Sequence, residues 1–358
     1  MTPEEAAALF FPDCRWTLRP LGQGNINLTC LLELANGRKL VLQHLNPAVF
    51  PDPQAIQENL RLVSAHLQRR ARPGPLDLRI LRPAAARGKS ALADPEGGLW
   101  RLLTYIGPSR TLATIHTTAQ AVSLGAVLGW FHQAMADFDA SQLVDPLPGF
   151  HDTGRYLGDL EARLQTLPSL PAQEARCRDQ IRSFAHLVTA FAEQSSGLSR
   201  QVIHSDPKVA NFLFDATGRQ AISLIDLDTV RFGVLIHDIA DCLRSACNPA
   251  GEEPEDPEKV PMREDLFLAV LQGYGSQAAG LLRPEDRRMI LTATRLICLE
   301  LAIRFLSDHL AGDRYFRVDY PGQNLVRARV QLALLHALTR QEARLQQLLA
   351  EKLLASLT

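Results

Sequence analysis

The run His204-Ser205-Asp206-Pro207-Lys208-Val209-Ala210-Asn211 is the feature that most constrains how this chain folds. An apolar stretch precedes it, and two apolar runs that flank a short glycine-containing turn follow it, which predicts a strand, a loop and then a β-hairpin. The hairpin leads directly into Ile225-Asp226-Leu227-Asp228. This order places Asp206, Asn211 and Asp226 at neighbouring strand ends.

Those three residue types suit phosphoryl transfer. The reaction needs a carboxylate that orients the acceptor hydroxyl and takes its proton, and oxygen ligands that hold Mg²⁺ on the nucleotide phosphates. We expect Asp206 to be the base and Asn211 and Asp226 the metal ligands. Lys208 places a cation where negative charge develops on the transferring group. In the alternative interpretation, His204 and Asp206 brace a turn and Asp226 caps a strand.

Bulk properties exclude several classes of protein. A chain of 358 residues favours two domains, or one domain in two lobes. The formal net charge is -1, from 38 basic and 39 acidic residues, so no global field attracts nucleic acid or an anionic membrane. The N-terminus is acidic, and the longest weakly polar stretch, 121–131, is about half the length needed to cross a bilayer. Six scattered cysteines indicate reduced thiols in a cytoplasmic protein.

The chain changes character near residue 106. Residues 15–45 contain three short β-like runs separated by glycine-containing breaks. An apolar repeat at helical spacing follows from Pro53, and a second β-rich piece ends at Ile106. Most of the remainder is helical in pattern. We therefore predict an α+β chain with a small antiparallel β lobe at 1–106 and a larger helical lobe at 107–358.

At this point the chain resembles the aminoglycoside phosphotransferase and choline kinase superfamily, relatives of the protein kinases. The H-x-D-x-x-x-x-N loop and the later Asp226 carry this resemblance. Further segments resemble the bacterial N-acetylhexosamine 1-kinase branch; they are GQGNINLT, LVLQHLNPAVFPDP, FHDT, HSDPKVANFLFD, LIDLDTV, DCLRSACN and AIRFLSDHLAGDRYF. The resemblance implies a two-lobed protein-kinase-like fold, a nucleotide-binding first lobe, a catalytic and substrate-binding second lobe, and ATP and Mg²⁺ as cofactors.

The resemblance also suggests the nucleotide-binding residues. Gly22 and Gly24 lie in a turn that kinase-like folds place over the phosphates, although an ordinary hairpin turn has the same pattern. Nucleotide-site residues expected with them are Asn27, Gln43 and Tyr105. Gln43 stands where a phosphate-binding lysine is expected, and Tyr105 at the join between lobes is either an adenine contact or plain core. Glu58 either faces that strand or lies on a solvated helix face.

The acceptor is expected to meet the helical lobe. Glu300, Arg304 and Asp308 recur at i, i+4 and i+8 on one helix face, which also fits a surface salt-bridge ladder. The resemblance to the sugar 1-kinase branch favours Arg304 as a substrate contact. The other expected substrate residues are Asp228, Asp308, Asp313 and Tyr315. Additional candidates for the same region are His151, Asp152, Arg155, Asp241 and Arg244, while Asp238 resembles the superfamily's brace of the catalytic loop.

Three functions remain open from the sequence. The first is an ATP-dependent sugar 1-kinase that phosphorylates an N-acetylhexosamine or related sugar by direct in-line transfer. The second is a kinase of another hydroxylated metabolite, such as an aminoglycoside or a choline-like alcohol. The third is a pseudokinase that only binds nucleotide. The expected partner is a small hydroxylated molecule, without nucleic acid or membrane, and the chain is expected to be a cytoplasmic monomer or homodimer.

Overall fold

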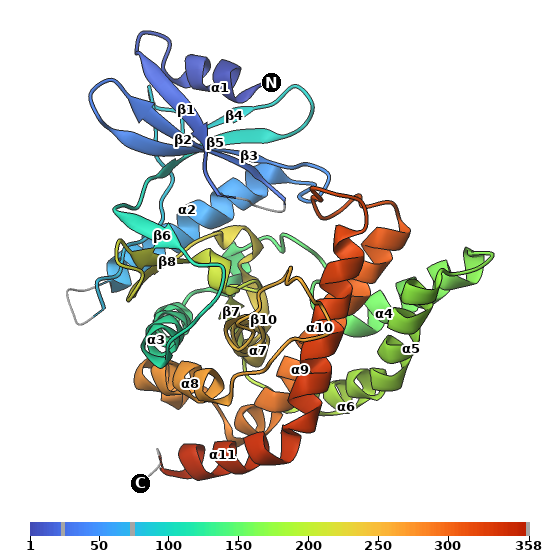
Figure 1. Cartoon of the computed structure of the whole chain (residues 1–358). Helices are drawn as coiled ribbons and strands as arrows, with labels where there is room; N and C mark the ends of the chain where they lie inside the picture. The colour runs from blue at the N-terminus through green and yellow to red at the C-terminus, as the bar shows by residue number, and fades with distance from the viewer. Residues whose placement is uncertain (23–25, 72–75, 356–358) are drawn as a thin grey trace.

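The computed structural model of the chain describes residues 1–22, 26–71 and 76–355, with side chains as far as residue 351. It has a small lobe built on a sheet and a larger helical lobe, which are stacked on one another (Figure 1). Within the described residues the small lobe contains a five-stranded antiparallel sheet in the order β1-β2-β3-β5-β4. The predicted α+β, two-lobed kinase-like fold is confirmed. The predicted boundary at residue 106 falls between β5 and β6.

The small lobe packs a helix on each side of its sheet. Its elements are α1 (Pro3–Phe10), β1 (Trp16–Pro20), β2 (Leu28–Leu34), β3 (Lys39–Leu45), α2 (Pro53–Arg70), β4 (Ala91–Ala93) and β5 (Leu99–Thr104). Thr2 and Glu5 form a capping box that starts α1, and Asp52 caps α2. The apolar stripe of α2 that the sequence predicts is buried, as Ile56, Leu60 and Val63 show. These helices sandwich the sheet and fix the strand that carries Gln43.

The larger lobe is mainly helical. Its helices are α3 (Thr118–Met135), α4 (Thr153–Thr166), α5 (Ala172–Phe184), α6 (His186–Gln194), α7 (Leu235–Ala246), α8 (Glu264–Ala278), α9 (Pro284–Leu310), α10 (Gln323–Arg340) and α11 (Glu342–Ala355). Short 3₁₀ turns are η1 (Ala140–Gln142), η2 (Ser195–Gly197), η3 (Val209–Asn211), η4 (Leu227–Thr229) and η5 (Ala279–Leu281). Its strands are β6 (Ser109–Thr111), β7 (Arg200–Ile203), β8 (Phe212–Asp215), β9 (Ala221–Leu224) and β10 (Arg231–Val234).

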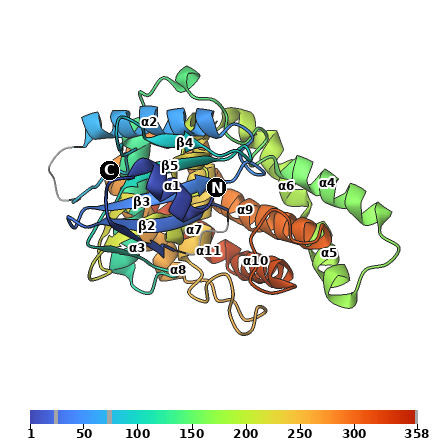
Figure 2. The same cartoon turned by 90° about the horizontal axis from the view of Figure 1, so that it is seen from above.

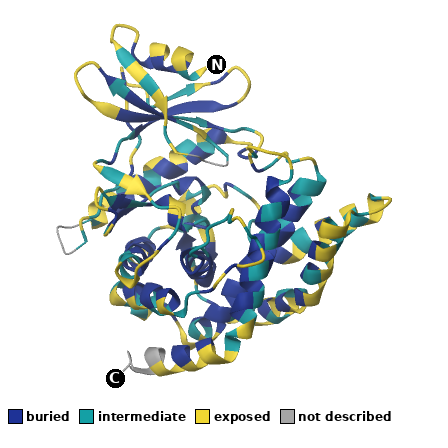
Figure 3. Cartoon of the chain, in the orientation of Figure 1, coloured by how far each residue is buried: buried dark blue, intermediate teal, exposed yellow. Residues whose placement is uncertain are grey.

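Helix α9 is the central element of this lobe. It contacts α4, α6, α7 and α10, and its middle is buried (Figure 3). Helices α4 and α5 are far more exposed and extend to one side, as the view from above shows (Figure 2). Helices α3 and α8 pack closely because each presents glycine to the other: a Cβ on Gly125 would overlap the Val270 carbonyl, and one on Gly273 the Val122 carbonyl. Helix α3 also contacts β7 and β9, the strands on either side of residues 204–211 and the hairpin.

The predicted hairpin is present. Strands β8 and β9 pair antiparallel, with Phe212 opposite Leu224, and Gly218 in their turn has a φ of +73°. Strand β6 adds to the other edge of β8, with Arg110 opposite Phe214. The hairpin therefore brings Asn211, at its start, next to Asp226, just beyond its end.

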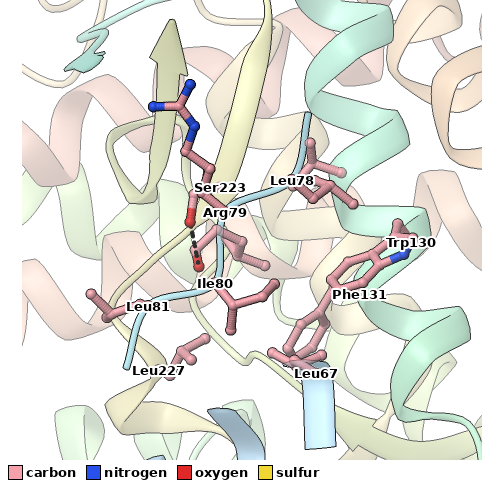
Figure 4. Close-up of a pocket in the computed structure, with 11 residues that line it drawn as sticks. Leu67, Leu78, Arg79, Ile80, Leu81, Trp130, Phe131, Ser223 and Leu227 are labelled. Carbon is pink, nitrogen blue, oxygen red and sulfur yellow. Dashed lines mark hydrogen bonds between the residues drawn. The ribbon is translucent and has the colours of Figure 1, made fainter. Parts of the chain in front are cut away.

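One internal cavity lies under the hairpin, among α2, residues 78–81, α3 and β9 (Figure 4). Its volume is about 10 Å³, and apolar side chains such as Leu67, Phe131 and Leu227 form most of its wall. A space of this size holds one water molecule at most, so it is not a ligand site.

No helix in the described part of the chain is both long enough and apolar enough to span a bilayer.

Candidate active site

The backbone of the predicted catalytic loop, residues 204–211, is held by Asp238, near the start of α7. The Asp238 carboxylate accepts hydrogen bonds from the backbone N–H groups of His204 at 2.6 Å and Ser205 at 2.7 Å. The His132 Nε2 atom lies 2.9 Å from the same carboxylate. Burial alone would raise the pKa of Asp238, but the bond to His132 and its positive field lower it, so the group is ionised. The bracing role expected for Asp238 is confirmed.

His204 also supports the loop. Its Nε2 atom lies 2.9 Å from the Ile225 carbonyl oxygen, and its Nδ1 atom lies 3.3 Å from the Asp206 backbone nitrogen. Complete burial lowers the pKa of His204, which favours the neutral ring. Ser205, between them, has a φ of +72°, a left-handed conformation that is strained for a non-glycine residue. The imidazole thus holds the strained loop against the hairpin.

The predicted catalytic carboxylate, Asp206, lies within this loop, between β7 and η3. The Asp206 side chain is 27% exposed, and Lys208 Nζ donates to its Oδ2 at 2.6 Å. Asn211 Nδ2 donates to the same Oδ2 at 3.0 Å and to the Asp206 carbonyl at 2.7 Å. Burial would raise the pKa of Asp206, but the Lys208 ammonium outweighs it and lowers the pKa. The structure therefore presents an ionised carboxylate that remains accessible.

Asp226 lies beside this group. The Ile225 backbone N–H donates to the Asn211 carbonyl at 2.8 Å, and Asp226 turns out of the strand with a φ of +63°. Burial and the carboxylates of Asp228 and Asp206 raise the pKa of Asp226 to about 7. The backbone bond between Ile225 and Asn211 thus brings Asp226 next to the residue that contacts Asp206.

These residues fit the oxygen chemistry of Mg²⁺. The amide nitrogen of Asn211 is used by Asp206, and its oxygen has no hydrogen-bond donor among the described residues. Asp226 is a carboxylate in a region of excess negative charge, which a divalent cation neutralises. The described residues contain no group of three or more His, Cys, Asp or Glu side chains able to enclose a metal by themselves. A magnesium nucleotide needs only one or two protein carboxylates, because phosphates and waters complete its shell.

A buried cation that the sequence analysis did not identify joins the two lobes. Arg101, on β5, donates through Nη2 to both oxygens of Asp228, at 2.6 and 2.8 Å, and each side chain is 1% exposed. Asn27 Nδ2 donates to Asp228 at 3.0 Å. Arg101 also donates through Nε to Gln43, its partner across the strand pair, at 3.0 Å. The one available signal was a charged residue inside the apolar run LWRLLT.

This network explains why position 43 carries an amide, and it shows that Asp228 contacts the small lobe. Gln43 accepts from Arg101 and donates to Thr29 Oγ1 at 3.0 Å, so its side chain is already engaged. Asp228, expected at the substrate, instead pairs with the small lobe. Its carboxylate is filled because Arg101 and Asn27 both donate to it.

The other nucleotide-side predictions have mixed positions. Gly22 has a φ of +76° and open space around it, whereas Gly24 lies outside the described residues. Tyr105 is half-buried, packs against the main core and covers Gly107, which agrees with plain core and leaves an adenine contact a prediction. Glu58 is 53% exposed and pairs with Arg61 at 2.6 Å. The solvated-face alternative for Glu58 is correct.

Arg304 lies in an aromatic cage. Its guanidinium carbon is 4.8 Å from the ring centre of Phe150, and 5.3, 5.6 and 5.4 Å from those of Tyr156, Tyr315 and Phe316. No hydrogen-bond acceptor is recorded for its guanidinium in the described part of the structure. The cage holds the cation by its faces and leaves its N–H groups for a ligand. Tyr315 therefore lies with Arg304, as predicted, and the sequence did not single out Phe150 or Tyr156.

The helix-face ladder predicted as an alternative does not form. Glu300 is 1% exposed, lies 3.0 Å from His151 Nδ1 and accepts from Thr153 Oγ1 at 2.7 Å. Burial would raise the pKa of Glu300, but the His151 imidazole and the Thr153 hydroxyl lower it to about 2. Each of the three helix residues therefore has partners outside the helix.

Asp308 organises a loop instead of facing a substrate. Its two oxygens accept from the backbone N–H groups of Arg314, Tyr315 and Phe316 at 2.9, 2.8 and 2.9 Å, and from Asn324 at 3.0 Å. The residue is 6% exposed, so the substrate assignment of Asp308 is not supported. Asp313 is half-buried and also accepts from Asn324, at 2.8 Å. Both acids position the loop that carries Tyr315.

The remaining candidates are structural contacts. His151 Nε2 lies 2.9 Å from the Ser205 carbonyl oxygen, which ties α4 to the catalytic loop. Asp152 caps α4 by accepting from the Arg155 N–H at 3.0 Å, and Arg155 donates to the Pro148 and Gly149 carbonyls. Asp241 and Arg244 face one another, with 2.6 Å between Oδ1 and Nη2.

Comparison with known proteins agrees with this architecture. A family model described as the phosphotransferase enzyme family matches residues 17–260. The structure of a microcompartment-associated aminopropanol kinase is similar, with 17% identity, 95% of this chain and 97% of that chain covered, and a TM-score of 0.63. The structure of amicoumacin kinase hAmiN in complex with AMP-PNP, Ca²⁺ and Ami is 15% identical, with 88% of this chain and 87% of that chain covered and a TM-score of 0.58. The GDP complex of aminoglycoside 2'-phosphotransferase-IIIa is 16% identical, with 92% of this chain and 97% of that chain covered and a TM-score of 0.58. At these identities the likeness shows a shared fold.

Proposed function

We propose that this chain, which belongs to the phosphotransferase enzyme family, transfers the γ-phosphoryl group of ATP to a hydroxyl group of a sugar. The observation that carries the proposal is the group formed by Asp206, Lys208 and Asn211 beside Asp226. An ionised, accessible carboxylate next to a lysine and a second acidic group has the residues that phosphoryl transfer needs.

Each residue has a proposed role in direct in-line transfer. Asp206 accepts a hydrogen bond from the acceptor hydroxyl, orients its oxygen and takes its proton as the bond to phosphorus forms. Lys208, 2.6 Å from Asp206, places positive charge beside the transferring group. Asn211 and Asp226 would hold Mg²⁺, which neutralises the nucleotide phosphates when bound. The lobe at 1–106 is the proposed nucleotide lobe, and 107–358 the proposed catalytic and acceptor lobe.

The acceptor is proposed to be an N-acetylhexosamine or a related sugar, phosphorylated at its anomeric hydroxyl. Arg304 offers free N–H donors from an aromatic cage, and Tyr315 lies beside it. Donors on an aromatic wall suit the hydroxyl or N-acetyl oxygens of a sugar. The nearby acids Glu300 and Asp308 are filled by protein donors and offer no free carboxylate to a cation.

An amino-alcohol acceptor is the second candidate. Its support is the shared fold, since one similar structure is an aminopropanol kinase and another an aminoglycoside phosphotransferase. Arg304 opposes it, because no carboxylate of the described residues lies within ion-pair distance of this guanidinium, which would repel a cationic acceptor. We also propose that the chain acts in the cytoplasm as a monomer or homodimer, in keeping with its balanced charge and free cysteines.

The test is ADP release with a panel of N-acetylhexosamines, simple hexoses, aminopropanol, choline and an aminoglycoside. We expect Mg²⁺-dependent release only with an N-acetylhexosamine or related sugar, and a loss of roughly 1,000-fold or more in Asp206→Asn while ATP still binds. Asp13→Asn, an exposed carboxylate in the small lobe, serves as the matched control and should keep full activity.

Each result decides between the candidates. Release with an amino alcohol instead of a sugar would keep the kinase assignment and remove the sugar. Nucleotide binding without turnover on any acceptor would favour a nucleotide-binding module. Full activity in Asp206→Asn would overturn the catalytic assignment itself.

A further inference from the structure

A second cavity lies behind the catalytic loop. Its volume is about 440 Å³, and its walls come from the start of α4, from α6, from the β7–β10 ribbon, and from α7 and α9. Cavities of this size are typical of small-molecule sites. The residues that line it do not include Asp206, Asn211, Asp226 or Arg304. It therefore differs from the proposed catalytic group, and it adjoins the proposed acceptor side through Phe150, whose ring also contacts Arg304.

The floor of this cavity holds an unpartnered histidine. His237 is 7% exposed, and its Nε2 atom has no hydrogen-bond partner in the part of the chain that the structure describes. Its ring stacks on Phe191, with centroids 5.2 Å apart, and lies 4.9 Å from the ring of His151. A buried polar atom without a partner is costly unless a ligand or water satisfies it. Burial lowers the pKa of His237 to about 3, so the ring is neutral and offers a hydrogen bond.

The wall charges favour an anion. Arg200 is exposed, its guanidinium lies over the Phe232 ring at 5.5 Å, and no carboxylate of the described residues is within ion-pair distance of it. Arg231 pairs with Asp145 at 2.9 Å, but its Nε atom has no partner in the described structure. The acid in the wall, Asp152, is engaged as the cap of α4. The cavity thus combines an apolar body with one arginine, Arg200, that has no ion-pair partner among the described residues, while Arg231 keeps only its Nε donor free.

The cavity also reaches the catalytic loop. His151 lines it, and the same imidazole lies 2.9 Å from the Ser205 carbonyl oxygen and 3.0 Å from the Glu300 carboxylate. The cavity is therefore lined by the ring that holds Ser205, the residue before Asp206. One side chain, His151, thus separates the cavity from the loop.

We propose that this cavity is a binding site for a small organic anion, a carboxylate or a phosphate monoester on an apolar body. The anionic group lies toward Arg200 and Arg231, the apolar body against Phe191, and a polar atom meets His237 Nε2. The proposal does not depend on which acceptor the catalytic group uses.

Calorimetric titration of the full chain with benzoate and with phenyl phosphate tests the site and separates the two anion classes. Neither probe has an alcohol hydroxyl, so neither is an acceptor. A saturating non-hydrolysable ATP analogue is present throughout, which fills the nucleotide site. We expect saturable binding of at least one anion, and binding of neutral benzamide weaker by about tenfold or more, because a charged hydrogen bond is lost.

Variants locate the binding. Arg200→Gln and His237→Phe should each lower the affinity for the anion by about tenfold. Arg38→Gln, an exposed arginine in the small lobe, should leave its affinity unchanged. Ala192→Trp, at an exposed position of α6 in the cavity wall, should abolish binding by filling the space. Thermal melting and binding of the ATP analogue show that each variant is folded.

Several results overturn the proposal. These are the absence of saturable binding for both anions, equal binding of benzamide, and full binding in Ala192→Trp. Anion binding that appears only in a parallel titration without the ATP analogue also overturns it, because the probe would then occupy the nucleotide site. None of these measurements requires turnover. The anion site can therefore be refuted while the proposed kinase activity is confirmed, and the kinase activity can be refuted while the anion site is confirmed.

Discussion

The ion pair between Arg101 and Asp228 should be one of the strongest single links between the lobes. Both side chains are 1% exposed, and Arg101 Nη2 is 2.6 and 2.8 Å from the two carboxylate oxygens. Arg101→Met leaves the Asp228 carboxylate buried with the Asn27 amide as its remaining side-chain donor. Breaking a buried pair in this way costs about 3–5 kcal/mol of unfolding free energy.

A double-mutant cycle measures this coupling. Urea unfolding, followed by circular dichroism, is compared for the wild type, Arg101→Met, Asp228→Leu and the double variant. The double variant buries no charge at this position, so it should be more stable than Arg101→Met and the coupling energy should be about 2–3 kcal/mol. Arg61→Met breaks an ion pair whose members are 59% and 53% exposed, and should cost at most about 1 kcal/mol.

The reasoning is refuted if Arg101→Met is as mild as Arg61→Met. It is also refuted if the losses from the two single variants simply add in the double variant, because additive losses mean that the two charges do not depend on each other.

Three other outcomes follow from the geometry. Asp238→Asn should lower kcat about 100-fold, because the loop at 204–211 is displaced, while the nucleotide affinity stays nearly unchanged. Steady-state kinetics and nucleotide titration measure the two quantities, and an unchanged kcat contradicts the prediction. Gly273→Ala should cost about 1–3 kcal/mol on urea unfolding because α3 blocks the added methyl, whereas Gly275→Ala, with open space around it, should stabilise by about 0.5–1 kcal/mol. Burial raises the pKa of Asp226 to about 7, so the stability that protonated Asp226 contributes without metal is complete below about pH 4 and is lost as pH rises through 7. Mg²⁺ should therefore raise the melting temperature more at pH 8 than at pH 6. The same pH-dependent increase in Asp226→Asn as in the wild type would contradict this.

Short-range order was readable from the residues alone. The hairpin after Asn211 follows from two apolar runs and a glycine turn, and the stripe on α2 follows from helical spacing. These features depend on neighbours within a few positions, so local chemistry decides them. The resemblance of the loop to the phosphotransferase superfamily extended that local order to the whole fold.

Partners distant along the chain could not be read in the same way. Arg101 and Asp228 are 127 positions apart, and nothing in either segment says that they meet. The spacing of Glu300, Arg304 and Asp308 correctly implied one helix, but each binds a different neighbour: His151 and Thr153, an aromatic cage, and a loop backbone. Spacing specifies which face of a helix a side chain occupies, and not what packs there.

The sequence by itself determined the loop at 204–211, the hairpin after it and the position of Asp226 just beyond that hairpin, because each depends on contacts between residues close in the chain. Only the tertiary structure decided which charged groups have partners. Asp228 pairs with Arg101, Asp308 accepts hydrogen bonds from a loop backbone, and the Arg304 guanidinium keeps its N–H donors available. The physical reason is that a buried charge needs a partner wherever the chain can bring one, and that choice is made in three dimensions.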